Sequence, residues 1–142
     1  MTDKLNPKRN WRRIGFIAAA VLAILTLGFW LWLPANGLPT AIKFIRWKFD
    51  DVRHIAPAEL STWLADTNRA APLLLDIRLE EEFIVSHLPN AQRITPEASD
   101  AELKKFLADS TKPIVVYCAV GYRSGKMARR LQALGHTNVF NL

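Results

Sequence analysis

The residue best suited to chemistry is Cys118, the only cysteine in the chain, which directly follows the apolar run 114–117. It opens the stretch Cys118-Ala-Val-Gly-Tyr-Arg123, after which Ser124 stands where a helix is expected to begin. A loop that turns into a helix points its backbone N–H groups into one concavity, and Gly121 permits the left-handed backbone that such a cradle requires. Helix N-termini and a nearby arginine lower a thiol pKa from about 8.5 into the range of about 3.5–7.5. The sequence therefore predicts that Cys118 is a nucleophilic thiolate that needs no general base.

A free cysteine is also common as a small buried apolar side chain, which is the alternative for Cys118. The arginine favours the reactive thiolate, because a basic group at the positive end of a helix is unfavourable unless an anion lies nearby. Tyr122 is expected at the rim of the pocket, and Lys126, on the following exposed helix face, is expected to help attract anionic donors. The expected anion cradle consists of Ala119, Val120, Gly121, Tyr122 and Arg123.

The elements that must position this loop alternate along the chain. Runs of strand length are found at residues 53–55, 73–77, 91–94, 114–117 and 139–140. Helical signals lie between them, among them Pro57 at a helix start and the capping-box spacing of Ser99 and Glu102. This alternation predicts an α/β fold with a parallel sheet covered by helices on both faces. Ligands collect at the carboxyl ends of strands in such sheets, which is where Cys118 stands.

Residues 14–33 contain no charged side chain over 20 positions. A helix of that length spans roughly the 30 Å apolar core of a bilayer. The apolar region of a cleavable signal peptide is shorter, about 7–15 residues, so a retained anchor is favoured over that alternative. Pro34 and Gly37 are expected to end the helix. Tryptophans, which prefer the membrane interface, stand at both ends: Trp11, Trp30 and Trp32.

The net charge of +6 is concentrated around this apolar segment. Residues 50–142 hold 11 basic and 12 acidic side chains, which argues against a nucleic-acid partner and favours membrane lipid. Five basic residues precede the segment and three follow it. The positive-inside rule thus places the N-terminus in the cytoplasm and the domain on the non-cytoplasmic side. With its one apolar span, the chain is expected to be a single-pass protein of a bacterial inner membrane. Residues 41–49 alternate apolar and basic side chains, and either lie on the lipid headgroups or pack on the domain.

Four stretches of the chain resemble the rhodanese family. Residues 74–83 (Leu-Leu-Asp-Ile-Arg-Leu-Glu-Glu-Glu-Phe) and 86–91 (Ser-His-Leu-Pro-Asn-Ala) are similar to its D-x-R…E-F…G-H-I-P-G-A signature. Residues 114–124 and 131–142 are similar to its C-x-x-G-x-R-S loop and the helix that follows. The resemblance covers residues 52–142. It implies a rhodanese-like domain there. The hydropathy and charge pattern divides the preceding residues into a basic tail (1–13), a transmembrane helix (14–33) and a juxtamembrane linker (34–51).

The resemblance implies sulfur transfer. Cys118 would take the outer sulfur of thiosulfate or of a persulfide donor, become a persulfide, and pass the sulfur to cyanide, a small thiol or a protein acceptor. The loop amides and Arg123 would stabilise both the thiolate and the persulfide. Arg78 would pair with Glu81 or Glu82, or line the pocket. The residues that match the family in supporting roles are Asp76, Arg78, His87 and Ser124.

Two alternatives remain open beside sulfur transfer. One is a thiolate phosphatase or arsenate reductase, although related phosphatases use a seven-residue loop and the loop from Cys118 to Arg123 has six residues. The other is a rhodanese-fold module that binds a partner without turnover. Ser86 and Asn90 replace the usual glycines of the family, a mild change at Asn90 because asparagine tolerates left-handed geometry. No organic cofactor or metal is implied, because the sequence has no nucleotide glycine fingerprint and no ligand cluster with metal spacing.

Overall fold

The computed structural model describes residues 7–108 and 111–142. The chain divides into two compact units, Met1–Thr40 and Ala41–Leu142. The long first helix, α1 (Pro7–Lys48), begins in the first unit and ends in the second.

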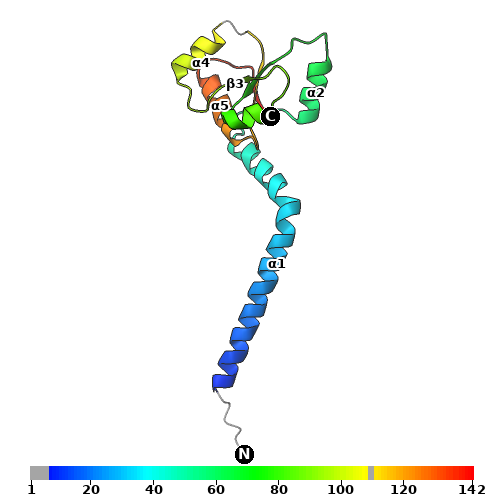
Figure 1. Cartoon of the computed structure of the whole chain (residues 1–142), viewed down its shortest axis with the longest axis vertical. Coiled ribbons are helices and arrows are strands. Elements are labelled where there is room, and N and C mark those ends of the chain that lie inside the picture. Colours follow the sequence, from blue (N-terminus) through cyan, green and yellow to red (C-terminus); the bar gives the residue numbers. More distant parts are fainter. Residues whose placement is uncertain (1–6, 109–110) are drawn as a thin grey trace, which may run out of the picture. The chain divides into compact units, whose positions relative to one another are not determined.

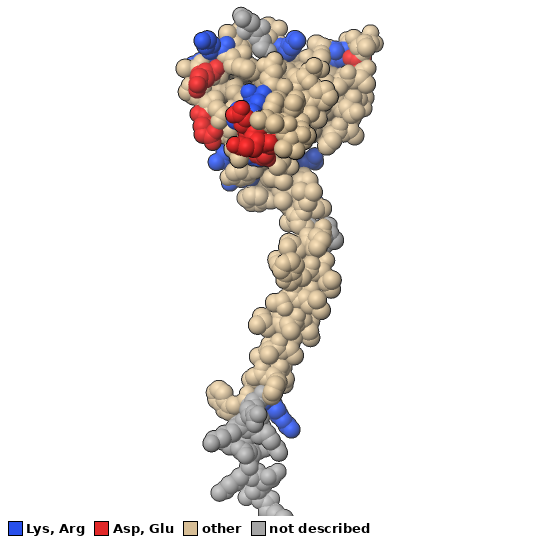
Figure 2. Space-filling view, viewed as in Figure 1, with Lys and Arg blue, Asp and Glu red and all other residues tan. Residues whose placement is uncertain are grey.

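The first unit contains one helical segment that is long and apolar enough to cross a membrane. It covers Arg13–Pro34, 22 residues with a mean hydropathy of 2.4, and the described chain buries none of it. After Arg13, this segment contains no charged residue, and the face of the helix seen in Figure 2 is accordingly free of red and blue along most of its length. Membrane anchors and signal sequences share a helix of this kind.

The prediction that Pro34 and Gly37 end the helix is wrong. Pro34 and Pro39 both lie inside α1, which continues to Lys48. A proline removes only its own backbone N–H and disturbs one turn, so the helix loses local hydrogen bonds without having to stop. The last turns of α1 are also fixed by packing, because the side chain of Ile45 is buried.

Segment 41–49 packs on the domain, one of the two alternatives left open by its sequence. Ile45 and, just beyond the helix, Phe49 belong to the main hydrophobic core of the second unit. Phe44 and Trp47 on the same segment remain exposed. The predicted linker 34–51 is therefore helical as far as Lys48, and its second half contributes to the core.

The second unit contains a five-stranded parallel sheet flanked by helices, which confirms the predicted fold class (Figure 1). The helices of this unit beyond α1 are α2 (Pro57–Ala65), α3 (Glu80–Val85), α4 (Asp100–Leu107) and α5 (Tyr122–Ala133). Across the sheet, the strands run in the order β1 (Arg53–His54), β5 (Val139–Asn141), β4 (Ile114–Tyr117), β2 (Leu73–Asp76) and β3 (Gln92–Arg93).

Two apolar layers cover the two faces of the sheet. Successive side chains of a strand point to opposite faces, so Leu75 and Leu74 of β2 belong to different layers. The layer of Leu75 includes side chains from α4 and α5, and the layer of Leu74 includes Leu60 and Trp63 from α2. Figure 1 shows α2 on one side of the sheet and α4 and α5 on the other.

Local signals account for how α4 begins and how α5 packs. The predicted capping box is formed, since Ser99 Oγ accepts from the Glu102 N–H at 3.2 Å and a Glu102 oxygen accepts from the Ser99 N–H at 2.7 Å. Gly125 on α5 lies against the ring of Phe49, and a Cβ there would come within 2.7 Å of it. The absence of a side chain at Gly125 thus lets α5 approach Phe49 closely.

Candidate active site

The carboxyl ends of β4 and β2 bring together the predicted site residues. Cys118 directly follows β4, and Asp76, the last residue of β2, is the sheet partner of Tyr117. The loop then turns through Gly121, whose φ of 92° is left-handed, into α5 at Tyr122. A glycine supplies this backbone without strain. The sequence pattern and the sheet register together place Cys118 and Asp76 at one edge.

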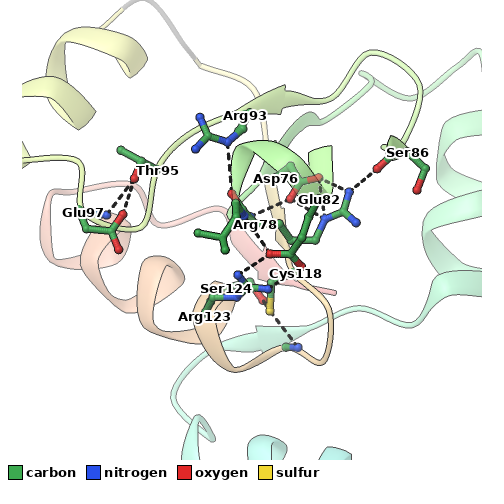
Figure 3. A network of polar contacts seen from close by, with 12 residues as sticks. Asp76, Arg78, Glu82, Ser86, Arg93, Thr95, Glu97, Cys118, Arg123 and Ser124 are labelled. Carbon is green, nitrogen blue, oxygen red and sulfur yellow. Dashed lines mark hydrogen bonds and ion pairs between the residues drawn. The ribbon is translucent and has the colours of Figure 1, made fainter. Parts of the chain in front are cut away.

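The sulfur of Cys118 accepts hydrogen bonds from its own loop and helix. The backbone N–H of Gly121 donates at 3.2 Å and the Ser124 hydroxyl at 3.4 Å (Figure 3). Burial raises the pKa of the Cys118 thiol, but the Ser124 hydroxyl and backbone N–H groups of Ser124, Val120 and Gly121 outweigh it and lower this pKa below its ordinary value. These contacts can therefore stabilise a sulfur anion.

Replacement of Ser124 by alanine is expected to make Cys118 a weaker nucleophile. The variant removes the hydroxyl that favours the thiolate, so the midpoint of the pH profile for alkylation by iodoacetamide moves upward. At neutral pH we expect the alkylation rate to fall by about threefold to tenfold. Ser61→Ala, on an exposed position of α2, is the matched control. An unchanged midpoint in Ser124→Ala would show that this hydroxyl does not tune the sulfur.

Asn141 holds the Cys118 loop from the neighbouring strand. Its side-chain Nδ2 donates to the carbonyl oxygen of Gly121 at 3.0 Å, and Asn141 is buried. Ala119 and Val120, which lie between Cys118 and Gly121 in the loop, are exposed. The buried Asn141 amide therefore supports a loop whose outer part is open to solvent. Sequence reasoning missed Asn141, although an amide inside the apolar run 139–142 was a signal for a buried polar role.

Arg123 is engaged by a carboxylate that sequence reasoning did not assign to it. Its two terminal nitrogens donate to the two oxygens of Glu82, at 2.8 and 3.0 Å (Figure 3). Glu82 also accepts from the Leu79 N–H at the start of α3. The Arg123 contact lowers the pKa of Glu82 to about 2, so the pair stays ionised at neutral pH. The guanidinium thus reaches the site with its charge already partly balanced.

Asp76 and Arg78 form a second ion pair that ties the loop after β2. Arg78 was predicted to pair with Glu81 or Glu82 or to line the pocket, but its guanidinium binds Asp76, with the shortest contact at 2.6 Å. It also donates to the Ser86 carbonyl oxygen at 2.6 Å. Burial raises the pKa of Asp76, but hydrogen bonds from Arg78 outweigh this and lower it overall. The pair fixes the backbone around α3, which carries Glu82.

His87 makes a local contact rather than one to the sulfur. Its Nδ1 lies 2.9 Å from the Phe83 carbonyl oxygen, and its ring stacks on the Phe83 ring with centroids 3.9 Å apart. These contacts hold His87 against α3, at the turn that follows this helix.

Asn90 adopts a φ of 61°, the left-handed geometry that the sequence indicated it tolerates.

A pocket of about 360 Å³ adjoins the Cys118 loop. Tyr122 is half-buried and lines the pocket. Its ring packs edge-on against the ring of Phe49, with the ring centroids 5.6 Å apart. Within 7–108 and 111–142, the histidines, cysteine and acidic residues do not gather into a group of three that could hold a metal. The other residues around the pocket are Leu79, Pro96, Glu97, Arg123, Lys126, Met127 and Arg130.

Two known proteins are similar in sequence to this chain. The chain is 32% identical over 96 residues to the adenylyltransferase and sulfurtransferase UBA4 of Candida albicans, covering 63% of this chain and 22% of that protein. It is 33% identical over 69 residues to the uncharacterized protein YqhL of Bacillus subtilis, covering 49% and 53%. The chain thus spans about a fifth and about half of these relatives' lengths.

Two further comparisons concern the fold and the family of this chain. The crystal structure of a rhodanese-like domain protein from Staphylococcus aureus has a TM-score of 0.50 and 27% identity, with 64% of this chain and 84% of that chain covered. Residues 56–142, more than half of the chain, match the family described as the rhodanese-like domain. The chain therefore belongs to the rhodanese-like domain family.

Proposed function

We propose that this protein is a membrane-anchored sulfurtransferase that carries sulfur as a persulfide on Cys118. The observation that carries the proposal is the paired donation to the sulfur from the Gly121 N–H and the Ser124 hydroxyl. Together with the lowered pKa of Cys118, it favours the thiolate form of this side chain. The family and the sulfurtransferase named among its relatives support the same class of reaction.

The reaction consists of two attacks on sulfur. In the first, the Cys118 thiolate attacks the outer sulfur of thiosulfate or of a persulfide, and sulfite or a thiolate leaves with the bonding electron pair. In the second, cyanide or an acceptor thiolate attacks the outer sulfur of the Cys118 persulfide, and the Cys118 thiolate is released. The same loop N–H groups serve the thiolate and the persulfide, because each places negative charge on sulfur next to them.

The Glu82–Arg123 pair is expected to control how well doubly charged donors bind. Glu82→Gln removes the carboxylate but leaves an amide of similar size, so the Arg123 guanidinium becomes available to thiosulfate. Both side chains are one-third exposed, and we expect the KM for thiosulfate to fall by about threefold to tenfold. Glu81→Gln, the adjacent residue, serves as the control. Equal KM values in the two variants would remove this role from Glu82.

Sulfur transfer is favoured over phosphate or arsenate chemistry by the length of the Cys118 loop and by the pairing of Arg123 with Glu82. The loop from Cys118 to Arg123 has six residues, one fewer than in the phosphatases of this fold. The hydrogen bonds that Arg123 donates to Glu82 also reduce the positive charge offered to a doubly charged oxyanion, which disfavours phosphate, arsenate and thiosulfate relative to an organic persulfide. The direct test is thiocyanate production from thiosulfate and cyanide by the full chain in detergent, beside hydrolysis of a phosphate ester. Turnover of the ester alone would contradict the proposal.

The segment Arg13–Pro34 is proposed to remain as a single-pass anchor in lipid, with the domain on the non-cytoplasmic side. Its length and hydropathy support the anchor, and the excess of basic residues before it supports the orientation. The test is whether protease added to intact bacterial spheroplasts cleaves a C-terminal tag. A tag protected until the membrane is lysed would contradict the orientation, and a chain lacking residues 1–40 after expression would contradict the retained anchor.

A further inference from the structure

The pocket beside the Cys118 loop is lined on one side by basic residues of α5. Arg123, Lys126 and Arg130 follow one another at intervals of three and four residues, which places them on one face of the helix. Tyr122 and Arg123 belong both to the loop that begins at Cys118 and to the pocket wall, so the pocket adjoins the loop that carries the reacting sulfur.

Two of these three cations already have carboxylate partners. Arg123 binds Glu82, and Arg130 binds Asp100 and also donates to the carbonyl oxygens of Pro96 and Ala98. Arg130 therefore fixes the segment that forms the opposite wall of the pocket. Lys126 is different, because no described carboxylate lies within ion-pair distance of it in residues 7–108 and 111–142. Its ammonium lies 5.2 Å from the centroid of the Tyr122 ring.

The rest of the lining is largely apolar. Met127 forms a buried part of the wall, and Leu79, Pro96 and Tyr122 add apolar surface. One acidic residue, Glu97, also faces the pocket and is engaged by the Thr95 hydroxyl, which lowers the pKa of this carboxyl. A ligand with a short apolar body and one negative charge matches this lining, whereas a second negative charge would meet Glu97.

We propose that this pocket is a binding subsite for the carboxylate of a small organic thiol or persulfide, with Lys126 as the residue that receives the carboxylate. The inference rests on the proposed sulfur transfer at Cys118 and specifies the kind of molecule that gives or takes the sulfur. The acceptor thiolate, held by its carboxylate, attacks the outer sulfur of the Cys118 persulfide. One S–S bond forms and one breaks, so the products are the organic persulfide and the Cys118 thiolate, with no oxidant or reductant consumed.

The test compares two acceptors that differ in one group, 3-mercaptopropionate and 3-mercaptopropanol. The full chain in detergent is assayed with thiosulfate as donor, for the native protein, Lys126→Gln and the control Lys104→Gln on the exposed face of α4. We expect the KM for 3-mercaptopropionate to rise about twofold to fivefold in Lys126→Gln only, and further in Lys126→Glu. The KM for 3-mercaptopropanol stays unchanged. Equal changes for both thiols, or none, would overturn the subsite.

A second measurement tests carboxylate binding in the pocket without requiring sulfur transfer. Cys118 is alkylated by 3-iodopropionate and by its neutral amide, and the ratio of the two rates is compared between variants. This ratio is expected to fall about twofold to fivefold in Lys126→Gln and to stay constant in Lys104→Gln. A ratio that Lys126→Gln leaves unchanged contradicts the subsite. A falling ratio in a protein that transfers no sulfur keeps the subsite while rejecting the proposed function.

Discussion

Replacement of Cys118 by alanine is expected to reduce sulfur transfer to the uncatalysed rate, a loss of at least about 10³-fold in kcat. No other residue can take its place as the sulfur carrier, because the chain has only one cysteine. The measurement is thiocyanate formation from thiosulfate and cyanide by the full chain in detergent.

Two further variants separate the loss of the thiol from damage to the loop. Cys118→Ser keeps an acceptor for the Gly121 N–H and the Ser124 hydroxyl, and it is expected to be equally inactive with an unchanged melting temperature. Val120→Ala alters an exposed side chain in the same loop and is expected to retain activity. Residual turnover in Cys118→Ala above the uncatalysed rate would contradict the assignment of the sulfur carrier.

Replacement of Phe49 by alanine is expected to destabilise the domain by about 3–5 kcal/mol. Phe49 is 1% exposed, its ring fills the space left by Gly125, and it meets the ring of Tyr122. The cavity left by alanine lies under the helix that follows the Cys118 loop. The free energy of unfolding is measured by pulse proteolysis of the full chain in urea, which reports the folded fraction of the domain.

Phe44 provides the matched control because it lies five residues earlier on the same segment and is 51% exposed. Phe44→Ala is expected to change the free energy of unfolding by less than about 0.5 kcal/mol. Equal losses in Phe44→Ala and Phe49→Ala would contradict the packing of segment 41–49 on the domain. The same packing means that a fragment beginning at Asp50 lacks two core side chains, Ile45 and Phe49.

The elements of the domain could be predicted because each has a local signal. The apolar run 114–117 and the capping pair Ser99 and Glu102 are readable within a few residues, and the structure has both features. The end of α1 was misjudged because proline is a local signal too, whereas the burial of Ile45 that stabilises the later turns depends on distant residues. A local rule failed there because tertiary packing decided the outcome.

The partners of the charged site residues could not be predicted for a related reason. Glu80, Glu81 and Glu82 are chemically alike in sequence, and only the orientation of α3 selects Glu82 for Arg123. Figure 2 shows that acidic side chains form several separate patches on this face of the domain, so acidic character alone does not single out one partner. Asn141 reaches Gly121 only because β5 lies beside β4 in the sheet. Residue type identified the chemistry of the loop, while sheet order and helix orientation decided which groups support it.

The intact mass of the full chain after incubation with a sulfur donor is the most direct test of persulfide formation on Cys118. The protein in detergent is reduced, exposed to thiosulfate or to an organic persulfide, freed of excess donor and weighed beside Cys118→Ala. We predict a gain of one sulfur, about 32 Da, in the native chain only, and its loss on addition of cyanide. No gain with either donor in a folded, reduced protein, or an equal gain in Cys118→Ala, would contradict persulfide transfer through Cys118.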